Sequence, residues 1–168
     1  TDPLLPIPNR RAFVRELNRM ISFAERYGTP STLMFIDLND MKKINDTYGH
    51  EAGDKALHHI AQMLQQHVRG TDVIGRLGGD EFGVILAQAD EATGAQKAQE
   101  LATMIAKHPL ELEGESIRMS LAFGTYTFRS GDEPQDALHK ADQAMYENKK
   151  AVKAENDEKA ARDNKGTP

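Results

Sequence analysis

The chain has 168 residues, which is enough for one domain with a hydrophobic core, and its 39% apolar and 28% charged residues are typical of a soluble globular protein. It contains no cysteine, which excludes disulfides and thiolate metal sites and favours a cytoplasmic location. The sequence has neither an apolar run of membrane-spanning length nor the order of a signal peptide. The formal net charge of −5 argues against a nucleic-acid partner but leaves a small anionic substrate open.

Residues 9–27 are predicted to form an amphipathic helix, because apolar residues recur on one face at helical spacing. Asn9 is a suitable N-cap for this helix, and Gly28 is a suitable stop signal. The apolar run over residues 32–38 predicts a buried strand. Residues 50–68 again repeat at helical spacing, so we expect a second helix there.

The middle of the chain predicts a hairpin. Val73–Arg76 and Glu81–Leu86 have the composition of short strands, and a Gly-Gly turn separates them. A third helix is expected over residues 91–107, which end before a proline. Residues 117–123 alternate between apolar and polar side chains, which predicts a half-buried strand.

A last helix is expected from Pro134 to about Lys150, because proline is well suited to a first helical position. The polar and charged residues 153–165 predict either a helical extension or a frayed tail. We therefore expect one domain over residues 1–153, followed by a charged and partly disordered C-terminal extension over residues 154–168.

The order of these elements predicts the fold class. Helix, strand, helix, hairpin, helix, strand and helix favour an α+β domain with a mainly antiparallel central sheet flanked by helices. The pattern does not predict a parallel Rossmann sheet. A Gly-x-Gly-x-x-Gly turn and a Walker loop are both missing from the sequence, so the two commonest nucleotide-binding devices are excluded.

The first cluster with chemical potential runs from Asp37 to Asp46. Asp37 follows a strongly apolar strand, so its carboxylate either lies at the end of the sheet or needs a partner. A hard cation such as Mg²⁺ would be such a partner. A strand-end aspartate that only caps the next turn explains the same pattern, and the residues of this stretch leave both interpretations open.

The second cluster runs from Arg76 to Phe82. Gly78 and Gly79 allow a tight turn and let a ligand approach the backbone closely. Asp80 and Glu81 follow at once and would face opposite sides if they begin a strand. A hairpin with polar turn residues is the simpler interpretation, but together with Asp37 the turn becomes a candidate site for metal-bound phosphates.

Five motifs occur in order along the chain: Asn9-Arg10-Arg11; Asp37 to Asp46; Tyr48-Gly49-His50 with Gly53-Asp54; Arg76 to Phe82; and Ala141-Asp142 with Met145-Tyr146 and Lys149. In this arrangement the chain resembles the GGDEF domain of diguanylate cyclases over about residues 2–153. The resemblance implies a fold related to nucleotidyl cyclase catalytic domains and polymerase palm domains. It also implies the condensation of two GTP into cyclic di-GMP and two pyrophosphates, at the interface of a homodimer.

The resemblance also implies roles for individual residues. Asp37, Asp80 and the Leu38 carbonyl would hold two Mg²⁺ (or Mn²⁺) ions per active site. Asp80 or Glu81 would help to remove the proton of the ribose 3′-hydroxyl, and Lys42 would contact the terminal phosphates.

Substrate contacts are implied for a wider set of residues: Asp40, Met41, Lys42, Asn45, His50, Asp54, Gly78, Gly79, Lys149 and Lys153. Asn45 and Asp54 would recognise the base. An aspartate can accept hydrogen bonds from both N1–H and the 2-amino group of guanine, and adenine offers neither donor at these positions. Asp54 is therefore a chemical reason to expect GTP rather than ATP.

Arg69 and Asp72 form an Arg-x-x-Asp motif just before the hairpin. In similar proteins this motif is the inhibitory site that binds the cyclic product, because arginine can stack on guanine and donate two hydrogen bonds to its edge. Two other functions remain open: a non-catalytic cyclic di-GMP receptor, and a GTP-binding module that regulates a neighbouring phosphodiesterase. We also expect an upstream sensory or receiver domain in the parent protein, which could be attached to a membrane.

The chain departs from the usual motifs of the family at several positions. Leu5-Pro6 stands where Thr-Gly is usual, which replaces a flexible turn by a stiff one. Asn39 stands where many members have a second aspartate, and Met41 replaces a usual phenylalanine. Val152-Lys153-Ala154 replaces the usual Gly-Arg-Asn, and Ala122 replaces a common serine. None of these changes removes a residue assigned to the metal or the base.

Overall fold

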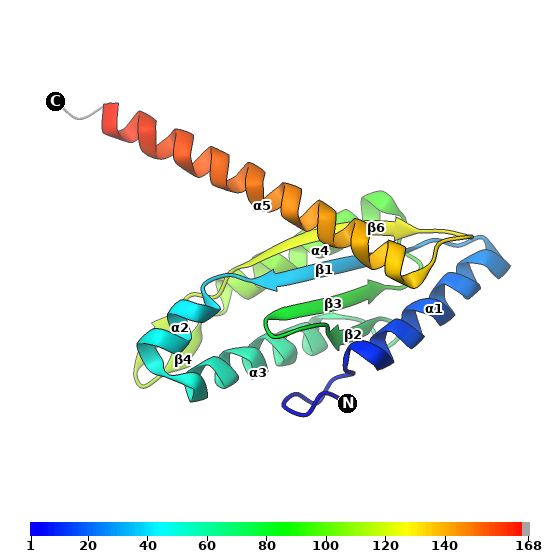
Figure 1. The fold of residues 1–168 in the computed structure, drawn as a ribbon, viewed down its shortest axis with the longest axis horizontal. Coiled ribbons are helices and arrows are strands. Elements are labelled where there is room, and N and C mark those ends of the chain that lie inside the picture. The colour runs from blue at the N-terminus through cyan, green and yellow to red at the C-terminus, as the bar shows by residue number, and fades with distance from the viewer. Residues whose placement is uncertain (166–168) are drawn as a thin grey trace.

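The computed structural model describes residues 1–165 (Figure 1). In chain order its elements are α1 (Arg10–Tyr27), β1 (Ser31–Leu38), α2 (Met41–Tyr48), α3 (His50–His67), β2 (Val73–Arg76), β3 (Glu81–Leu86), α4 (Glu91–Lys107), β4 (Leu110–Leu112), β5 (Glu115–Ile117), β6 (Leu121–Phe128) and α5 (Pro134–Lys165). The central sheet has the strand order β2-β3-β1-β6, and β4 with β5 forms a separate hairpin. The expected α+β class is confirmed.

Strand β1 lies inside the sheet and is antiparallel to both of its neighbours. Its register with β3 places Asp37 opposite Glu81, and its register with β6 places Asp37 opposite Ala122. Because β2 is also antiparallel to β3, the turn that joins them lies at the same end of the sheet as Asp37. The sheet therefore brings the two clusters found in the sequence together at one end of its strands.

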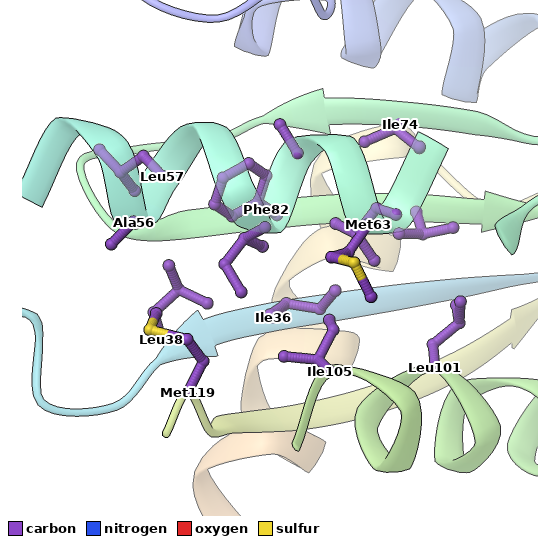
Figure 2. Packing of buried hydrophobic residues seen from close by; sticks show 14 of the residues in the cluster. Ile36, Leu38, Ala56, Leu57, Met63, Ile74, Phe82, Leu101, Ile105 and Met119 are labelled. Carbon is purple, nitrogen blue, oxygen red and sulfur yellow. The ribbon is translucent and has the colours of Figure 1, made fainter. Parts of the chain in front are cut away.

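Side chains of β1 alternate between two hydrophobic cores. Ile36 and Leu38 face the core that contains α3 and α4, and Figure 2 shows them among residues of both helices and Phe82 of β3. Leu33 and Phe35 face the second core, which α1 and α5 cover. The helices therefore cover both faces of the sheet, and each fully buried side chain of this size contributes about 1.5–3 kcal/mol relative to an exposed one.

Helix α1 has the ends that its sequence predicts. The Asn9 side chain accepts a hydrogen bond of 2.9 Å from the Ala12 N–H, which satisfies one of the free donors of the first turn. Gly28 has a φ of 72° and donates its N–H to the Ala24 carbonyl at 2.8 Å.

The predicted strand over residues 117–123 is wrong in its extent. Ile117 ends β5, residues 118–120 are not in a strand, and β6 runs from Leu121 to Phe128. The alternation misled because Met119 is fully buried although it lies in the connection between the hairpin and the sheet. The missed signal was the turn at Glu113 and Gly114, whose φ angles of 50° and 81° are those of a tight β-hairpin.

Two further elements differ from the sequence prediction. Helix α2 was not among the predicted elements, because its eight residues give little periodicity. Helix α5 continues to Lys165, so residues 153–165 are a helical extension rather than a frayed tail. Figure 1 shows this end of α5 projecting away from the sheet. Residues 166–168 of the expected extension lie outside the described residues. Within residues 1–165, no helix is both long and apolar enough to cross a membrane.

Gly124 of β6 tests the packing of α5 on the sheet, because a Cβ at this position would overlap the α5 backbone at Met145 and Ala141. We expect Gly124→Ala to lower the free energy of unfolding by about 1–3 kcal/mol in urea denaturation. Gly70→Ala is the control, since its Cβ would have no atom within 4 Å, and should change the stability by less than about 0.5 kcal/mol. Equal effects of the two substitutions would contradict the close contact.

Candidate active site

A cleft of about 470 Å³ lies at the end of the sheet, between α2, α3 and the Gly-Gly turn. Its walls contain most of the residues for which the sequence predicted a substrate contact. The lining residues are Met41, Lys42, Asn45, Asp46, His50, Gly53, Asp54, Leu57, Arg76, Gly79 and Asp80. The fold therefore collects in one cavity side chains that are up to about forty positions apart in the sequence.

The first turn of α2 forms one wall of the cleft. Asp40 precedes this helix with a φ of 62°, and its side chain makes no capping hydrogen bond. The first backbone N–H groups of α2 are consequently left without a capping side chain, and Lys42 is exposed beside them. Free N–H groups at a helix start, together with an ammonium group, are suited to bind phosphate oxygens.

The opposite wall depends on a glycine. The Asn45 side chain lies so close to α3 that a Cβ on Gly53 would overlap its Oδ1 atom. Because Gly53 has no side chain, the amide of Asn45 can lie against α3. It is there next to Asp54, which follows Gly53 in the sequence and also lines the cleft. His50 begins α3 in the same wall. The arrangement places an amide, a carboxylate and an imidazole around one part of the cleft.

The Arg76 side chain holds the Gly-Gly turn through hydrogen bonds to its backbone. Its Nε donates to the Gly78 carbonyl at 3.1 Å, and its Nη2 donates to the Gly79 carbonyl at 2.8 Å. Its Nη1 lies 3.2 Å from Oδ1 of Asp2, which completes a contact between the N-terminal segment and the turn. Sequence reasoning assigned no role to Arg76 or Asp2, although Arg76 belongs to one of the motifs on which the resemblance rests.

Asp2 is fixed as a carboxylate. Burial acts to raise its pKa, but hydrogen bonds from the N–H groups of Leu4 and Leu5 and from Arg76 outweigh burial and lower the pKa. Leu5 and Ile7 are buried at 1% and 2% exposure, so this segment is anchored in the core. Leu5 of the unusual Leu5-Pro6 pair therefore supplies, with Ile7, an apolar anchor to the segment that supports the turn, whereas Pro6 is exposed.

Asp37 lies beside Asp80, which lines the cleft, although Asp37 itself is not one of the lining residues. The Leu38 N–H donates to the Asp80 carbonyl at 3.0 Å, which ties the turn to the end of β1. Burial and then the negative charge of Asp80 raise the pKa of Asp37. Lys149 of α5 opposes this change, with its Nζ 3.6 Å from Asp37 Oδ2.

Glu81 faces away from the cleft. It lines a separate pocket of about 350 Å³ on the α1 and α5 side of the sheet, together with Arg10 and Asp142. Burial, followed by the charges of Asp37 and Asp142, raises the pKa of Glu81, and Arg10 opposes the change. Asp80 and Glu81 thus lie on opposite sides, as strand alternation predicts, and of the two only Asp80 lines the cleft.

The residues present fit a magnesium site. Asp37 and Asp80 offer two carboxylates, and Leu38 adds a backbone carbonyl at the same strand end. Within residues 1–165, no group of three or more histidine, cysteine or acidic side chains is arranged to hold a metal ion. Mg²⁺ characteristically binds one or two carboxylates and completes its shell with phosphates and water, so two carboxylates suffice.

The two lysines of α5 are placed differently. Lys149 reaches Asp37 rather than the cleft, and its side chain is 51% exposed. Lys153 lies one turn further along the helix and is exposed. It is not among the described residues that line the cleft. The structure therefore brings Lys149 to the candidate metal ligands but leaves Lys153 outside the site.

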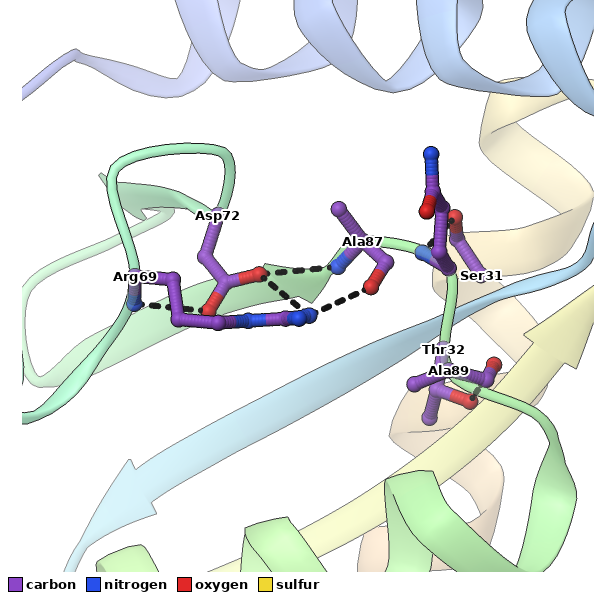
Figure 3. A network of polar contacts seen from close by, with 7 residues as sticks. Ser31, Thr32, Arg69, Asp72, Ala87 and Ala89 are labelled. Atoms are coloured by element: carbon purple, nitrogen blue, oxygen red, sulfur yellow. Dashed lines mark hydrogen bonds and ion pairs between the residues drawn. The ribbon is translucent and has the colours of Figure 1, made fainter.

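Arg69 and Asp72 form a network with the end of β3 (Figure 3). Asp72 accepts from the Arg69 N–H and the Ala87 N–H, at 2.9 Å each, and its side chain is only 2% exposed. Arg69 Nη2 donates to the Ala87 carbonyl at 2.6 Å, yet the side chain is 53% exposed and borders a cleft of about 370 Å³. Asp72 thus has a structural role that sequence reasoning missed, while Arg69 is available to a ligand.

The raised pKa of Asp37 predicts a stability effect. The folded state binds the Asp37 proton more tightly than the unfolded state, whose pKa is near 3.8, so the stabilising protonated form is lost as pH rises through the folded pKa. Without metal, Asp37→Asn should raise the free energy of unfolding at pH 7 by up to about 1 kcal/mol, and the gain should shrink near pH 3. Urea denaturation at both pH values, with Glu25→Gln as an exposed control, tests this. A loss of stability at pH 7 would contradict it.

Comparisons with known proteins agree with this geometry. Residues 1–155 match the family described as diguanylate cyclase, GGDEF domain. The chain is 36% identical over 151 residues to the diguanylate cyclase DgcP of Pseudomonas aeruginosa, covering 90% of this chain and 22% of that protein. It is 35% identical over 146 residues to the diguanylate cyclase DosC of Escherichia coli, covering 86% of this chain and 32% of that protein. The chain thus spans between a fifth and a third of these relatives.

Solved structures show the same fold. The diguanylate cyclase SiaD of Pseudomonas aeruginosa, in complex with its activator SiaC, has a TM-score of 0.85 and 27% identity over 89% of this chain and 58% of that one. The GGDEF domain of DgcB from Caulobacter crescentus, in complex with c-di-GMP, has a TM-score of 0.84 and 27% identity over 90% of both chains. Because the sequence match covers nearly the whole chain and the fold agrees, the protein belongs to the GGDEF family of diguanylate cyclases.

Proposed function

We propose that this domain condenses two GTP molecules into cyclic di-GMP and two pyrophosphates. The observation that carries the proposal is the cleft, which joins the free first turn of α2 and Lys42 to Asn45, Asp54 and Asp80. One part of the cleft is suited to phosphates, and another presents the polar groups that a guanine edge requires. The membership of the family supports the same activity.

The base and the phosphates would be held by different elements. The Asp54 carboxylate would accept from N1–H and the 2-amino group of guanine, and the Asn45 amide, which Gly53 admits, would add a further hydrogen bond. The N–H groups after Asp40, including that of Met41, would donate to the phosphate oxygens. His50, Gly78 and Gly79 would shape the remaining walls of the site.

Asp37, Asp80 and the Leu38 carbonyl would hold Mg²⁺ (or Mn²⁺), two ions per site. When bound, these ions neutralise the triphosphate, increase the acidity of the 3′-hydroxyl and stabilise the departing pyrophosphate. Asp80 is better placed than Glu81 to take the hydroxyl proton, because Asp80 lines the cleft. Lys149 pairs with Asp37 in this structure, and a cation bound at Asp37 would free the ammonium group for the phosphates.

The reaction requires two copies of the domain. Each cleft would hold one GTP, and the 3′-hydroxyl oxygen of one GTP would attack the α-phosphorus of the other. The bond between the α-phosphorus and the bridging oxygen of the pyrophosphate then breaks. Two such steps close the ring of cyclic di-GMP, so a homodimer is the active form and a single copy is inactive.

A second binding function is favoured by the position of Arg69. Its guanidinium is half exposed beside a cleft of about 370 Å³, where it can meet a guanine edge. We propose that cyclic di-GMP binds there and inhibits the enzyme. Asp72 would contribute mainly by holding the Arg69 turn against Ala87, because both of its oxygens already accept backbone N–H groups.

The cyclase activity can be tested directly with GTP and Mg²⁺. We expect an artificially dimerised sample to produce cyclic di-GMP and the variant Asp80→Ala to lose at least about 100-fold in rate, because both a metal ligand and the proton acceptor are removed. Chromatography of the products provides the measurement, and Glu25→Gln is the control that should stay active. A dimerised wild-type protein that yields no cyclic product would refute the proposal.

Calorimetry with cyclic di-GMP tests the second site. Arg69→Ala should weaken product binding by about tenfold or more with little change in thermal stability, since the guanidinium is half exposed. Asp72→Ala should instead lower the free energy of unfolding by about 1–3 kcal/mol, because two backbone N–H groups lose their acceptor. Arg162→Ala, far along α5, serves as the control. An unchanged affinity in Arg69→Ala would remove the proposed site.

A further inference from the structure

Two histidines meet where α3 and α4 end, far from the cleft. His67 is the last residue of α3, and His108 follows the last residue of α4 as its C-cap. The 18 residues of α3 separate His67 from His50 at the cleft by about 25 Å along the helix. The cyclase function proposed above uses neither histidine, although His67 also lines the cleft beside Arg69 that we propose for cyclic di-GMP.

Hydrogen bonds fix the tautomer of both rings. Nδ1 of His67 lies 2.8 Å from the Met63 carbonyl, and Nδ1 of His108 lies 2.8 Å from the Met104 carbonyl. A carbonyl oxygen can only accept, so each Nδ1 must carry a hydrogen. In the neutral ring this leaves a lone pair on Nε2, and neither Nε2 has a hydrogen-bond partner among the described residues.

This arrangement is the one found in metal-binding histidines. Such a ring usually donates its other N–H to a carbonyl or a carboxylate, which sets the tautomer and the ring orientation and makes the ligating nitrogen more basic. Here the carbonyl one turn earlier in each helix supplies this partner. The Nδ1 hydrogen bond of each histidine therefore leaves the lone pair of its Nε2 atom available to a metal ion.

The two rings are also near each other. Their centroids are 6.5 Å apart, with an angle of 47° between the ring planes, and both side chains are exposed. A bond from imidazole to Zn²⁺ is about 2.0–2.1 Å long, so one ion holds two nitrogen ligands within about 4 Å of each other, and rotation of the exposed side chains would have to bring the two Nε2 atoms to that separation. The backbone of His108 is held by a further contact, because His59 Nε2 donates to the His108 carbonyl at 2.8 Å.

We propose that His67 and His108 form a binding site for one divalent transition-metal ion, such as Zn²⁺, Ni²⁺ or Cu²⁺. Imidazole nitrogen suits these ions, and the chain has no cysteine to compete for them. The described residues contain no cluster of three or more suitable side chains, so water completes the coordination shell. The ion would join the ends of α3 and α4 and stabilise the folded state.

This site differs in chemistry from the carboxylate pair at the cleft. Asp37 and Asp80 offer oxygen, which suits Mg²⁺, whereas His67 and His108 offer nitrogen. Excess Mg²⁺ can therefore fill the carboxylate pair while leaving the histidine pair free. The proposal does not depend on cyclase activity, so either can fail without the other.

Isothermal titration calorimetry with ZnCl₂, in the presence of excess Mg²⁺, tests the proposal. We expect the wild-type protein to bind one Zn²⁺, and His67→Ala and His108→Ala each to weaken binding by at least about tenfold, because one of two ligands is lost. His58→Ala is the matched control, since His58 is an exposed histidine of α3 that is not part of the pair, and it should bind as the wild type does. Absence of Zn²⁺ binding to the wild type would overturn the site.

A second measurement identifies the ligands directly. In nitrogen NMR spectra of the imidazole rings, Zn²⁺ should shift the Nε2 signals of His67 and His108 and leave that of His58 in place. Thermal unfolding should show Zn²⁺ raising the Tm of the wild type but not that of the double variant His67→Ala, His108→Ala. Binding of unchanged affinity in a folded double variant would assign the ion to another site and refute the proposal.

Discussion

The antiparallel pairing of β1 with β3 is the constraint on which the candidate active site depends. This pairing sets Asp37 opposite Glu81, and the Leu38 N–H donates to the Asp80 carbonyl at 3.0 Å just beyond the last paired residues. A shift of register by one residue would turn Asp37 towards the opposite core and separate it from Asp80. The buried residues on both faces of β1 prevent this shift, because it would expose them or place them in the wrong core.

The same pairing gathers negative charge in a partly buried place. Burial and the charge of Asp80 raise the pKa of Asp37, and burial and the charges of Asp37 and Asp142 raise the pKa of Glu81, so the folded state carries an electrostatic cost at neutral pH. Lys149 and Arg10, from the two helices that cover this face, reduce the cost without removing it. The Mg²⁺ ions proposed for this site would relieve the repulsion, so the charges that lower stability without metal would be the ones that bind it.

The sequence predicted the elements that have strong local signals. The hairpin strands, α1 with Asn9 and Gly28, and α4 are where the pattern places them, because caps, turns and periodicity act over a few residues. The β4–β5 hairpin was missed because three-residue strands give almost no alternation. Helix α2 was missed for a similar reason, since only Met41 and Ile44 are buried along its eight residues.

The residues of the candidate site could likewise be predicted where they belong to local motifs, but not where their contacts depend on the fold. Residues such as Lys42, Asn45 and Asp54 could be named because they belong to motifs, and the structure places them in one cleft. The contact of Lys149 with Asp37 could not be derived, because it depends on how α5 crosses β1. The burial of Asp72 also could not be derived, because its partner Ala87 is fifteen positions away.

The β2–β3 hairpin links the two regions for which we propose ligands. At one end, Arg76 holds the carbonyls of Gly78 and Gly79 next to the cleft. At the other end, Asp72 and Arg69 hold the N–H and carbonyl of Ala87, just after β3. Side chains of β2 and its preceding turn thus fix the backbone at both ends of β3 and position the turn that carries Asp80. The Arg69 guanidinium has five N–H donors, and the bond to the Ala87 carbonyl uses one of them, so the other donors can serve the ligand proposed above while the contact with the end of β3 is kept.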